Sequence, residues 1–492
     1  LDGPLLHIQD RRAVVWVRLM GSKKKQYDNL EITDIEYQGY GIARLDGKVI
    51  FVEHALPGEV VDVRLRRNKR DHAFAFVLNY RKRSERRVTP FCEHFGPCGG
   101  CKWQYLGYAD QLQYKEYFVH EVMRRIGKLE DAPIHPIIGC ETDRRYRNKM
   151  EYSFSTGRWL TQDEVESGAS VEDRRALGFH VRGRYDRVID LNECHLQPEP
   201  SNAIRNAVNA FARERELPYF DHVSHEGFLR TLVIRTTSTG ETMVILVLAY
   251  EREEWRRRVL DFIAERFPEV TSLYYIINER KNDSVIGLPA HYYAGREYLL
   301  ERCGELELKI GPQSFYQTNS EQAERLYAVV ASWAGLQGTE TVYDLYCGIG
   351  SIGLYLAPDA ARVIGIESVE EAIADGRENA RHNGITNMEF VHGEAESVLD
   401  EVFTERRSAP DLVVLDPPRA GLHRDAVDAV MRLAPKQILY VSCKPSTQAR
   451  DLQLFRERYD VLRMQPVDMF PQTYHIENVC DLRLRGQEPS RS

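Results

Sequence analysis

The sequence predicts a multidomain α/β protein that begins with a small β-barrel and ends in a doubly wound sheet. Three observations lead to this fold class. The 492 residues correspond to about three domains of ordinary size. From Thr341 onward, apolar runs of strand length alternate with helical stretches, which is the pattern of an open, mostly parallel sheet. Between Leu30 and Leu78, short alternating runs are broken by glycine, as in a small closed barrel.

The overall composition is that of a soluble globular protein, with 28% charged and 43% apolar residues. No run of 18 apolar residues occurs, so we expect neither a transmembrane helix nor a membrane partner. The start of the chain lacks the charged and apolar regions of a secretory signal. The nine cysteines are an odd number, which favours metal binding or catalysis over disulfides. We therefore expect a cytoplasmic protein, monomeric and without an obligate protein partner.

Residues 1–25 are predicted to be a flexible N-terminus, and residues 26–84 to form an OB-like barrel. Five short strands are expected between Leu30 and Leu78. The net charge of −8 argues mildly against nucleic acid, but cations concentrate in the last barrel strands. A run of charges is usually only a solvated face. This clustering instead favours contact with RNA phosphates by Arg66, Arg67 and Lys69.

Residues 85–103 are predicted to be a metal-binding loop. Cys92, Cys98 and Cys101 lie within ten residues, and a Gly-Gly pair between the last two lets the backbone turn tightly. The spacing is that of neither ferredoxins nor radical enzymes, so zinc and a [4Fe–4S] cluster both remain open. Either metal site requires a fourth ligand. Cys194 is the best supplier, with His94 and His195 as substitutes.

The middle of the chain is predicted to hold a helix and an α+β domain. Apolar spacing predicts a helix over residues 104–126, in a segment (104–136) that packs on the catalytic domain. Strands and helices then alternate through residues 137–310, a central RNA-binding domain that includes Cys194. The basic stretch with Arg147, Asn148 and Lys149 suits RNA phosphates and bases, and a plain basic loop explains it equally well.

Residues 311–487 are predicted to form a Rossmann-like domain that binds a cofactor with a ribose. Gly348, Gly350 and Gly353 follow its first strand, and the acidic Glu367 ends the second strand, where it suits a ribose diol. The turn carries no lysine for phosphates. This combination favours S-adenosylmethionine, and a dinucleotide is the alternative.

Cys443 is the candidate nucleophile of this domain. It follows a buried-strand pattern that begins at Ile438, and ligands of open α/β sheets bind at the carboxyl ends of the strands. A cysteine is more often a small core residue. Its neighbours argue otherwise, because Asp416 follows another apolar run and Glu477 lies downstream in the Asp468–Glu477 stretch.

Four stretches together resemble the RNA (uracil-C5)-methyltransferases: Ser314-Phe-Tyr-Gln-Thr-Asn319, Asp344–Gly350 with Glu367, Asp416-Pro-Pro-Arg-Ala-Gly421, and Val441-Ser-Cys-Lys-Pro445 with Asp468-Met-Phe-Pro471 and Glu477. The barrel resembles a TRAM domain through Tyr37–Arg44 and Ala55–Glu59. The cysteine loop with Cys194 resembles the [4Fe–4S] loop of the ribosomal members. The resemblance implies S-adenosylmethionine as cofactor, an iron–sulfur cluster rather than zinc, and 23S rRNA as partner.

In such an enzyme, attack of a thiolate on C6 of uracil makes C5 nucleophilic, and a base then removes the C5 proton. The resemblance implies that Cys443 is the nucleophile, that Glu477 is the proton acceptor, and that Asp416 lies beside cofactor and base. It also implies cofactor contacts at Gln317, Tyr346, Ser351, Glu367 and Glu394. Phe315 stacks on the methionine end or on a base, or packs in the core. Lys444 is expected to lower the pKa of Cys443.

The predicted function is methylation of C5 of a uridine in 23S rRNA through a covalent adduct of Cys443 with C6. The alternatives are the same chemistry on the T-loop uridine of tRNA and a non-catalytic RNA-binding or ribosome-assembly protein. A redox iron–sulfur protein is a further alternative. The intact pair Cys443 and Glu477 argues against the non-catalytic alternative.

Overall fold

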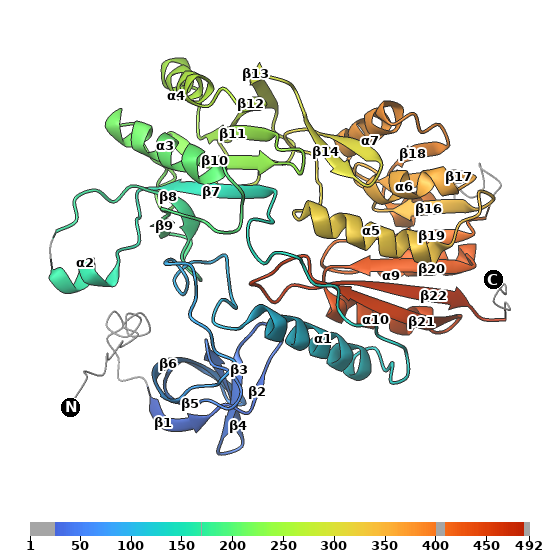
Figure 1. The fold of residues 1–492 in the computed structure, drawn as a ribbon, viewed down its shortest axis with the longest axis horizontal. Coiled ribbons are helices and arrows are strands. Elements are labelled where there is room, and N and C mark those ends of the chain that lie inside the picture. The colour runs from blue at the N-terminus through green and yellow to red at the C-terminus, as the bar shows by residue number, and fades with distance from the viewer. Residues whose placement is uncertain (1–24, 169, 400–408, 487–492) are drawn as a thin grey trace, which may run out of the picture. The chain divides into compact units, whose positions relative to one another are not determined.

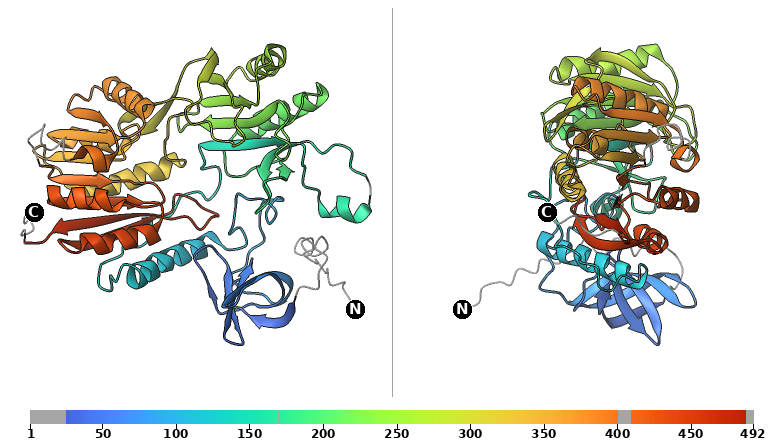
Figure 2. Two further views of the ribbon diagram at one scale, coloured as in Figure 1. Left: turned by 180° about the vertical axis from the view of Figure 1, so that it is seen from behind. Right: turned by 90° about the vertical axis from the view of Figure 1, so that its right-hand side faces the viewer.

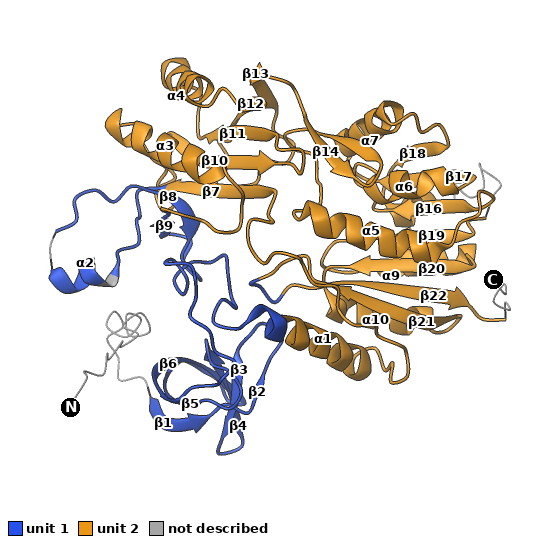
Figure 3. Cartoon of the chain, in the orientation of Figure 1, with its two compact units in different colours: residues 1–111, 155–191, 472–474 blue, residues 112–154, 192–471, 475–492 orange. Residues whose placement is uncertain are grey.

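The structure is a computed structural model that describes residues 25–168, 170–399 and 409–486 (Figure 1; further views in Figure 2). The chain divides into two compact units (Figure 3). Unit 1 contains the described residues up to 111, with 155–191 and 472–474. Unit 2 contains residues 112–154, 192–471 and the described residues from 475. The predicted flexible N-terminus lies, apart from Lys25, outside the described residues. The domain boundaries expected from the sequence stay predictions.

Unit 1 contains a six-stranded barrel sheet in the order β1-β5-β6-β4-β3-β2. Its core is aliphatic because the side chains at every second position point inward, as Val61, Val63 and Leu65 do along β5. The sequence pattern predicts five strands, and the structure has six because the first splits at Ile32-Thr33. The strands are β1 (Gln26–Glu31), β2 (Asp34–Ile35), β3 (Gly41–Leu45), β4 (Lys48–Glu53), β5 (Val60–Asn68) and β6 (His72–Lys82).

Unit 1 also contains the cysteine loop, a short helix and a hairpin. The helix α2 (Gln162–Ser167) begins with a capping box between Thr161 and Glu164. The hairpin pairs β8 (Ala176–His180) with β9 (Val188–Asp190). The first turn of α1 (Tyr108–Arg125) belongs to unit 1, and the rest of this helix, which the sequence predicts over 104–126, belongs to unit 2.

The middle of unit 2 is built on a sheet whose strands follow the order β13-β12-β11-β10-β7. Strands β10 and β11 are buried almost throughout, which explains their continuous apolar runs. The elements are β7 (Lys149–Ser155), α3 (Ser201–Glu214), β10 (Leu229–Thr236), β11 (Thr242–Leu248), α4 (Glu253–Arg266), β12 (Ser272–Ile277), β13 (Ala290–Gly295) and the hairpin of β14 (Leu299–Cys303) and β15 (Leu306–Ile310).

The C-terminal part of unit 2 is a seven-stranded sheet in the order β18-β17-β16-β19-β20-β22-β21. The first five strands are parallel, and β22 pairs antiparallel with both β20 and β21. The elements are α5 (Ser320–Ala334), β16 (Thr341–Leu345), α6 (Ser351–Leu356), the 3-10 turn Ala357–Asp359, β17 (Arg362–Glu367), α7 (Glu370–His382), β18 (Met388–His392), β19 (Leu412–Leu415), α9 (Arg424–Leu433), β20 (Gln437–Ser442), α10 (Pro445–Phe455), β21 (Tyr459–Val467) and β22 (Glu477–Leu484).

Helices cover both faces of this C-terminal sheet. Helix α5 lies on one face, and α9 and α10 lie on the other (Figure 2, right). With both faces covered, the parallel strands are buried and all their carboxyl ends open at one edge. None of the helices in the described part of the chain combines the length and the apolar character that crossing a bilayer requires.

Candidate active site

Cys443 lies immediately after β20, at the carboxyl edge of the parallel strands. The strand is buried along its whole length, and Pro445 begins α10 two residues after the thiol. The Cys443 side chain is partly buried. Burial and, to a lesser extent, the charge of Glu477 raise the pKa of this thiol to about 11, and Arg419 opposes both effects. The free thiol is therefore protonated at neutral pH.

The cation that acts on Cys443 is Arg419, which lowers the pKa of the thiol through its charge and a side-chain hydrogen bond. The sequence-based prediction gives this role to Lys444, and the structure assigns it to Arg419 instead. Lys444 adjoins the thiol in sequence, but at the N-terminus of α10 its backbone amide donates to Ser442 Oγ (3.2 Å). The sequence feature that could have identified Arg419 is its position in the Asp416-Pro-Pro-Arg stretch.

Glu477 and Asp416 come from the two strands that flank β20. The antiparallel register pairs Ser442 with Asn478, so Cys443 and Glu477 are neighbours at the sheet edge. Glu477 is buried, and this burial, with the charge of Asp416, raises its pKa well above the usual range. Asp416 follows β19, and burial raises its pKa to about 7. The structure thus brings the three predicted catalytic side chains to one place.

The turn after β16 provides the predicted cofactor cradle. Tyr346 adopts a left-handed backbone (φ 63°), and the amide of Gly348 donates to Glu367 Oε2 (3.0 Å). Glu367 Oε1 also accepts from the amides of Ser368 and Val369, which fixes this carboxylate at the end of β17. At Gly350, whose φ is 78°, a Cβ would lie 2.7 Å from the Phe390 ring, so only glycine fits.

Asp344 lies at the end of β16, under the same turn, and its burial raises its pKa to about 7. One carboxylate oxygen accepts from the Gly353 amide (2.9 Å), and the other, Oδ1, has no hydrogen-bond partner. A buried acceptor without a partner is costly unless a ligand or water satisfies it. The chemistry of this turn therefore fits a bound polar cofactor.

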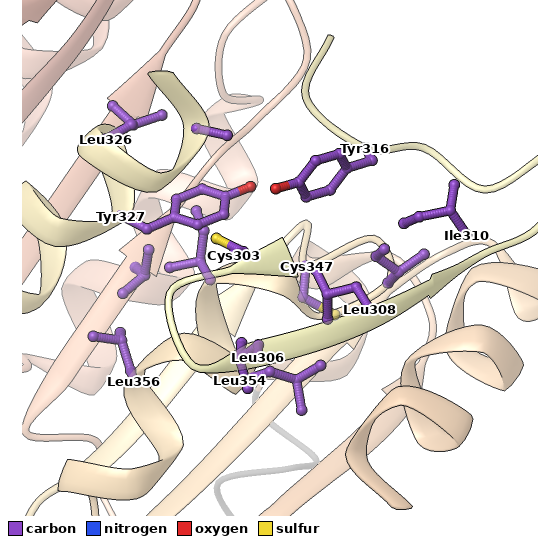
Figure 4. Packing of buried hydrophobic residues seen from close by; sticks show 14 of the residues in the cluster. Cys303, Leu306, Leu308, Ile310, Tyr316, Leu326, Tyr327, Cys347, Leu354 and Leu356 are labelled. Atoms are coloured by element: carbon purple, nitrogen blue, oxygen red, sulfur yellow. The ribbon is translucent and has the colours of Figure 1, made fainter. Parts of the chain in front are cut away.

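The remaining predicted cofactor residues lie around the same edge. Gln317 is buried in the loop before α5, where Tyr316 packs beside Tyr327 and Cys303 (Figure 4). Ser351 begins α6, and its Oγ lies 2.9 Å from the Tyr327 hydroxyl. Glu394 is exposed after β18 and helps to raise the pKa of Tyr346, which burial raises most.

The predicted RNA contacts of unit 2 have different surroundings. Asn148 is buried, and its amide nitrogen donates to Gln317 O (2.8 Å) and to Ser320 Oγ (2.9 Å). Both hydrogen bonds hold the loop and the start of α5, so the side-chain donors of Asn148 are engaged within the protein, and its contact with RNA stays a prediction. Arg147 and Lys149, on either side of Asn148, are partly buried. Phe315 is 66% exposed, which excludes the alternative that Phe315 packs in the core.

In unit 1, the barrel displays its basic residues next to aromatic rings. Arg66, Arg67 and Lys69 are exposed at the end of β5 and in the following turn. The sequence-based prediction missed a cluster of four partly buried rings whose centroids lie 5.2–6.4 Å apart, namely Tyr40, Phe51, His72 and Phe74. Their signal was the alternation along β4 and β6, whose register pairs Phe51 with Phe74.

The three cysteines of the loop are partly buried in unit 1. The Gly100 amide donates to Cys98 Sγ (3.4 Å), as the Gly-Gly turn allows. Burial lowers the pKa of Lys102 to about 8, and Cys98 and Cys101 oppose this effect. Cys194, in unit 2, is buried, and burial raises the pKa of its thiol. Hydrogen bonds from the amides of Leu196 and Gln197 partly oppose this increase.

Comparison with known families accounts for this arrangement. The model of the family described as tRNA (Uracil-5-)-methyltransferase matches residues 231–484, which include all the catalytic candidates. The chain belongs to this family. A TRAM domain model matches residues 22–78, the region of the barrel. The predicted family and the TRAM domain are thereby confirmed.

Relatives of this uracil methyltransferase extend over nearly the whole chain. An RNA methyltransferase of Bacteroides thetaiotaomicron is 46% identical over 451 residues, which cover 91% of this chain and 99% of the relative. One of Porphyromonas gingivalis is 45% identical, with 93% and 100% covered. The crystal structure of Pyrococcus abyssi tRNA (uracil-54, C5)-methyltransferase with S-adenosyl-L-homocysteine is 27% identical, with a TM-score of 0.72 and 93% and 100% covered.

The protein is therefore an S-adenosylmethionine-dependent RNA (uracil-C5)-methyltransferase. The multidomain α/β fold class predicted from the sequence is confirmed as well. Both the family and the TRAM domain imply an RNA substrate.

Proposed function

We propose that this methyltransferase acts on C5 of a uridine in 23S rRNA through a covalent bond between Cys443 and C6 of the base. The observation that supports the mechanism is the register of β20 and β22. It makes Cys443 and Glu477 neighbours at the carboxyl edge, where both are coupled electrostatically to Asp416 and Arg419. A nucleophile, a carboxyl group and a cation thus act on the same reacting base.

The proposed reaction proceeds in steps, in which Cys443 and Glu477 have different roles. C5 of uracil is a weak nucleophile, and attack of the Cys443 thiolate on C6 makes C5 enolate-like. S-Adenosylmethionine supplies the methyl group that C5 takes up. Glu477, as the carboxylate, then removes the C5 proton, and Cys443 is eliminated to restore the aromatic ring. The target uridine must leave its stack to reach the sheet edge.

Arg419 counteracts the environment that keeps both groups protonated. Burial raises the pKa of Cys443 and that of Glu477, and the Arg419 guanidinium lowers both. The active forms, thiolate and carboxylate, are both anions, so one neighbouring cation favours both. We infer that Arg419 shifts the site toward its reactive state.

Residues at the ends of the parallel strands fit the methyl donor. Tyr346, Ser351 and Glu367 surround the glycine turn, and Asp416 lies at the next strand end. Gln317 approaches this edge from the loop before α5, and Glu394 from the segment after β18. The Glu367 carboxylate suits the ribose diol. These six residues are the proposed cofactor contacts.

The choice of 23S rRNA rests on the combination of a TRAM barrel with the cysteine loop, which resembles the ribosomal members of the family. The exposed Arg66, Arg67 and Lys69 beside aromatic rings suit phosphates and stacked bases. A second candidate substrate is tRNA, because the similar Pyrococcus abyssi structure is a tRNA (uracil-54, C5)-methyltransferase. We infer a cytoplasmic monomer without an obligate protein partner in either case.

We also propose that the cysteine loop holds a [4Fe–4S] cluster with Cys92, Cys98, Cys101 and Cys194 as ligands. The donor chemistry fits, because amide hydrogen bonds reach the sulfurs of Cys98 and Cys194 and would stabilise their thiolate forms. A Cys98→Ser variant should lose the brown colour and the iron of the wild type. Full iron and sulfide content in that variant would contradict this ligand set.

The test of function is methyl transfer from labelled S-adenosylmethionine to unmodified 23S rRNA and unmodified tRNA, assayed side by side with nucleoside analysis. We expect 5-methyluridine in rRNA alone. Label in tRNA alone would preserve the mechanism and replace the substrate. RNA carrying 5-fluorouridine should trap the Cys443 adduct, because Glu477 has no proton to remove at C5.

Variants test the mechanism independently of the substrate. Cys443→Ala should abolish both methylation and adduct while RNA still binds. Cys303→Ala is the matched control, since this buried thiol belongs to β14 and should leave the adduct unchanged. Full methylation by Cys443→Ala would overturn the covalent mechanism.

A further inference from the structure

The loop of residues 311–319, which we call the cofactor loop, has no helix or strand to hold it and yet carries the proposed cofactor contact Gln317. It connects β15 to α5. Within it, Ser314 and Gln317 are buried while Phe315 is exposed. A binding side chain on an irregular loop needs other residues to fix its position. Those residues come from the middle sheet of unit 2.

Arg235 is the main support of the cofactor loop. It lies near the end of β10, is only 4% exposed, and reaches the loop with its guanidinium. Its Nη1 donates to the carbonyl oxygens of Gly311 (2.9 Å) and Ser314 (2.8 Å), and more weakly to that of Pro312 (3.4 Å). One side chain therefore binds three of the first four residues of the loop.

The loop is also held by helix α7, which packs on the catalytic sheet. Ser314 Oγ donates to Asp375 Oδ2 on α7 (2.5 Å) and accepts from the Gly311 amide (2.8 Å). Asn148 adds the contact with Gln317 O, and the hydroxyl of Ser320, its other acceptor, donates to the buried Glu301 (2.6 Å). The loop thus has anchors on both sides of Gln317.

We propose that Arg235 is a positioning residue that holds the cofactor loop in the geometry in which Gln317 contacts S-adenosylmethionine. This inference rests on the proposed role of Gln317. Arg235 itself reaches the loop backbone and not the reacting atoms, so its effect is on cofactor affinity. An unpaired buried guanidinium would be costly, and the loop carbonyls supply the acceptors that it needs.

The burial of Arg235 agrees with this assignment. Burial lowers the pKa of its guanidinium to about 10, and the carboxylates of Glu151, Glu301 and Asp375 oppose that effect. A buried cation that contributes only to stability can often be replaced by apolar residues without loss of stability. Its Nη1 donates to three carbonyl oxygens of one functional loop, which explains why an arginine occupies the position.

Arg230 offers a matched control on the same strand. It is 1% exposed at the start of β10, and its guanidinium donates to the carbonyl oxygens of Asn278, Arg280 and Asn282. It therefore holds a different loop by the same kind of contact. Loss of either arginine removes a buried cation, but only loss of Arg235 frees the cofactor loop.

The experiment measures binding of S-adenosylhomocysteine to the full-length protein by calorimetry, together with steady-state kinetics. Arg235→Met should weaken binding about 10- to 100-fold, the range by which the loss of a residue that orients binding groups lowers affinity in metal sites. The KM for S-adenosylmethionine should rise with it, while the KM for RNA stays unchanged. Arg235→Lys should recover part of the affinity, and Arg230→Met should bind like the wild type.

Normal affinity in a folded Arg235→Met variant, or an equal loss in Arg230→Met, would overturn the inference. If Arg235→Met does not fold, Ser314→Ala frees the same loop from the other side, and normal affinity there would overturn it. Gln317→Ala separates the two proposals. A loss in Gln317→Ala with normal affinity in Arg235→Met would overturn the inference alone, whereas normal affinity in Gln317→Ala would contradict the assignment of Gln317 and the inference that rests on it.

Discussion

Replacing Lys115 with methionine is expected to destabilise the protein by about 3–5 kcal/mol, because the change leaves a buried carboxylate without its cation. Lys115 on α1 and Asp468 are both fully buried, with Nζ 2.6 Å from Oδ1. Nζ also donates to the Phe470 carbonyl (3.1 Å). Asp468 opens the segment that leads toward Glu477, so the ion pair joins the helix to the catalytic sheet.

Urea denaturation of four proteins measures this effect: the wild type, Lys115→Met, Asp468→Asn and the double variant. The double variant should recover most of the loss, because neither charge is then left alone. Lys149→Met is the matched control, since Lys149 pairs with Glu151 at 3.0 Å, but its side chain is 33% exposed and that of Glu151 is 59% exposed. That change should cost below about 1 kcal/mol. Equal losses in Lys115→Met and Lys149→Met would refute the reasoning.

Arg419→Met should move the rise of kcat/KM with pH to higher pH, because it removes the cation that lowers the pKa of Cys443; an unchanged pH–rate profile would contradict this role. Burial raises the pKa of Asp416 from 3.8 to about 7, so its contribution to stability is present below pH 3.8 and is lost as the pH rises through 7. Asp416→Asn should therefore be more stable than the wild type at pH 8, by up to about 4 kcal/mol, in urea titrations. Alanine substitutions at the three exposed barrel cations, Arg66, Arg67 and Lys69, should lower the salt dependence of RNA binding. In filter binding, the slope of the logarithm of the binding constant against the logarithm of the salt concentration should fall by about 2–3. A weaker binding constant with an unchanged slope would exclude phosphate contacts by these residues.

The catalytic sheet could be predicted closely from the sequence. The predicted strands Arg362–Glu367 and Gln437–Ser442 are the observed β17 and β20. Strands buried on both faces read as continuous apolar runs, and the polar residue that follows each run marks the carboxyl edge. This regularity also placed Asp416 and Cys443 at one edge of the sheet. The pairing of Glu477 with this edge needed the antiparallel return of β22, which local patterns do not encode.

The roles of Asn148 and Lys444 could not be read from the sequence. The basic stretch around Asn148 has the composition of an RNA-binding loop, but the acceptors of its amide lie 169 and 172 residues away. Lys444 adjoins Cys443 in sequence, whereas the cation that reaches the thiol, Arg419, comes from the neighbouring strand end. Composition reports which chemistry is available, and only the tertiary fold decides which partner each side chain meets.

The positive charges of the proposed cofactor explain why two buried acids lie at the edge of the catalytic sheet. Asp344 and Asp416 are buried acids whose pKa values rise to about 7, and the Asp344 environment leaves one oxygen without a partner. In isolation, such burial is a cost to stability. The proposed cofactor is a sulfonium and ammonium cation, which favours the carboxylate forms of both acids. The carboxylates of Asp344 and Asp416 are therefore stabilised by an opposite charge only when the methyl donor is bound. Arg419 stabilises the anionic thiolate of Cys443.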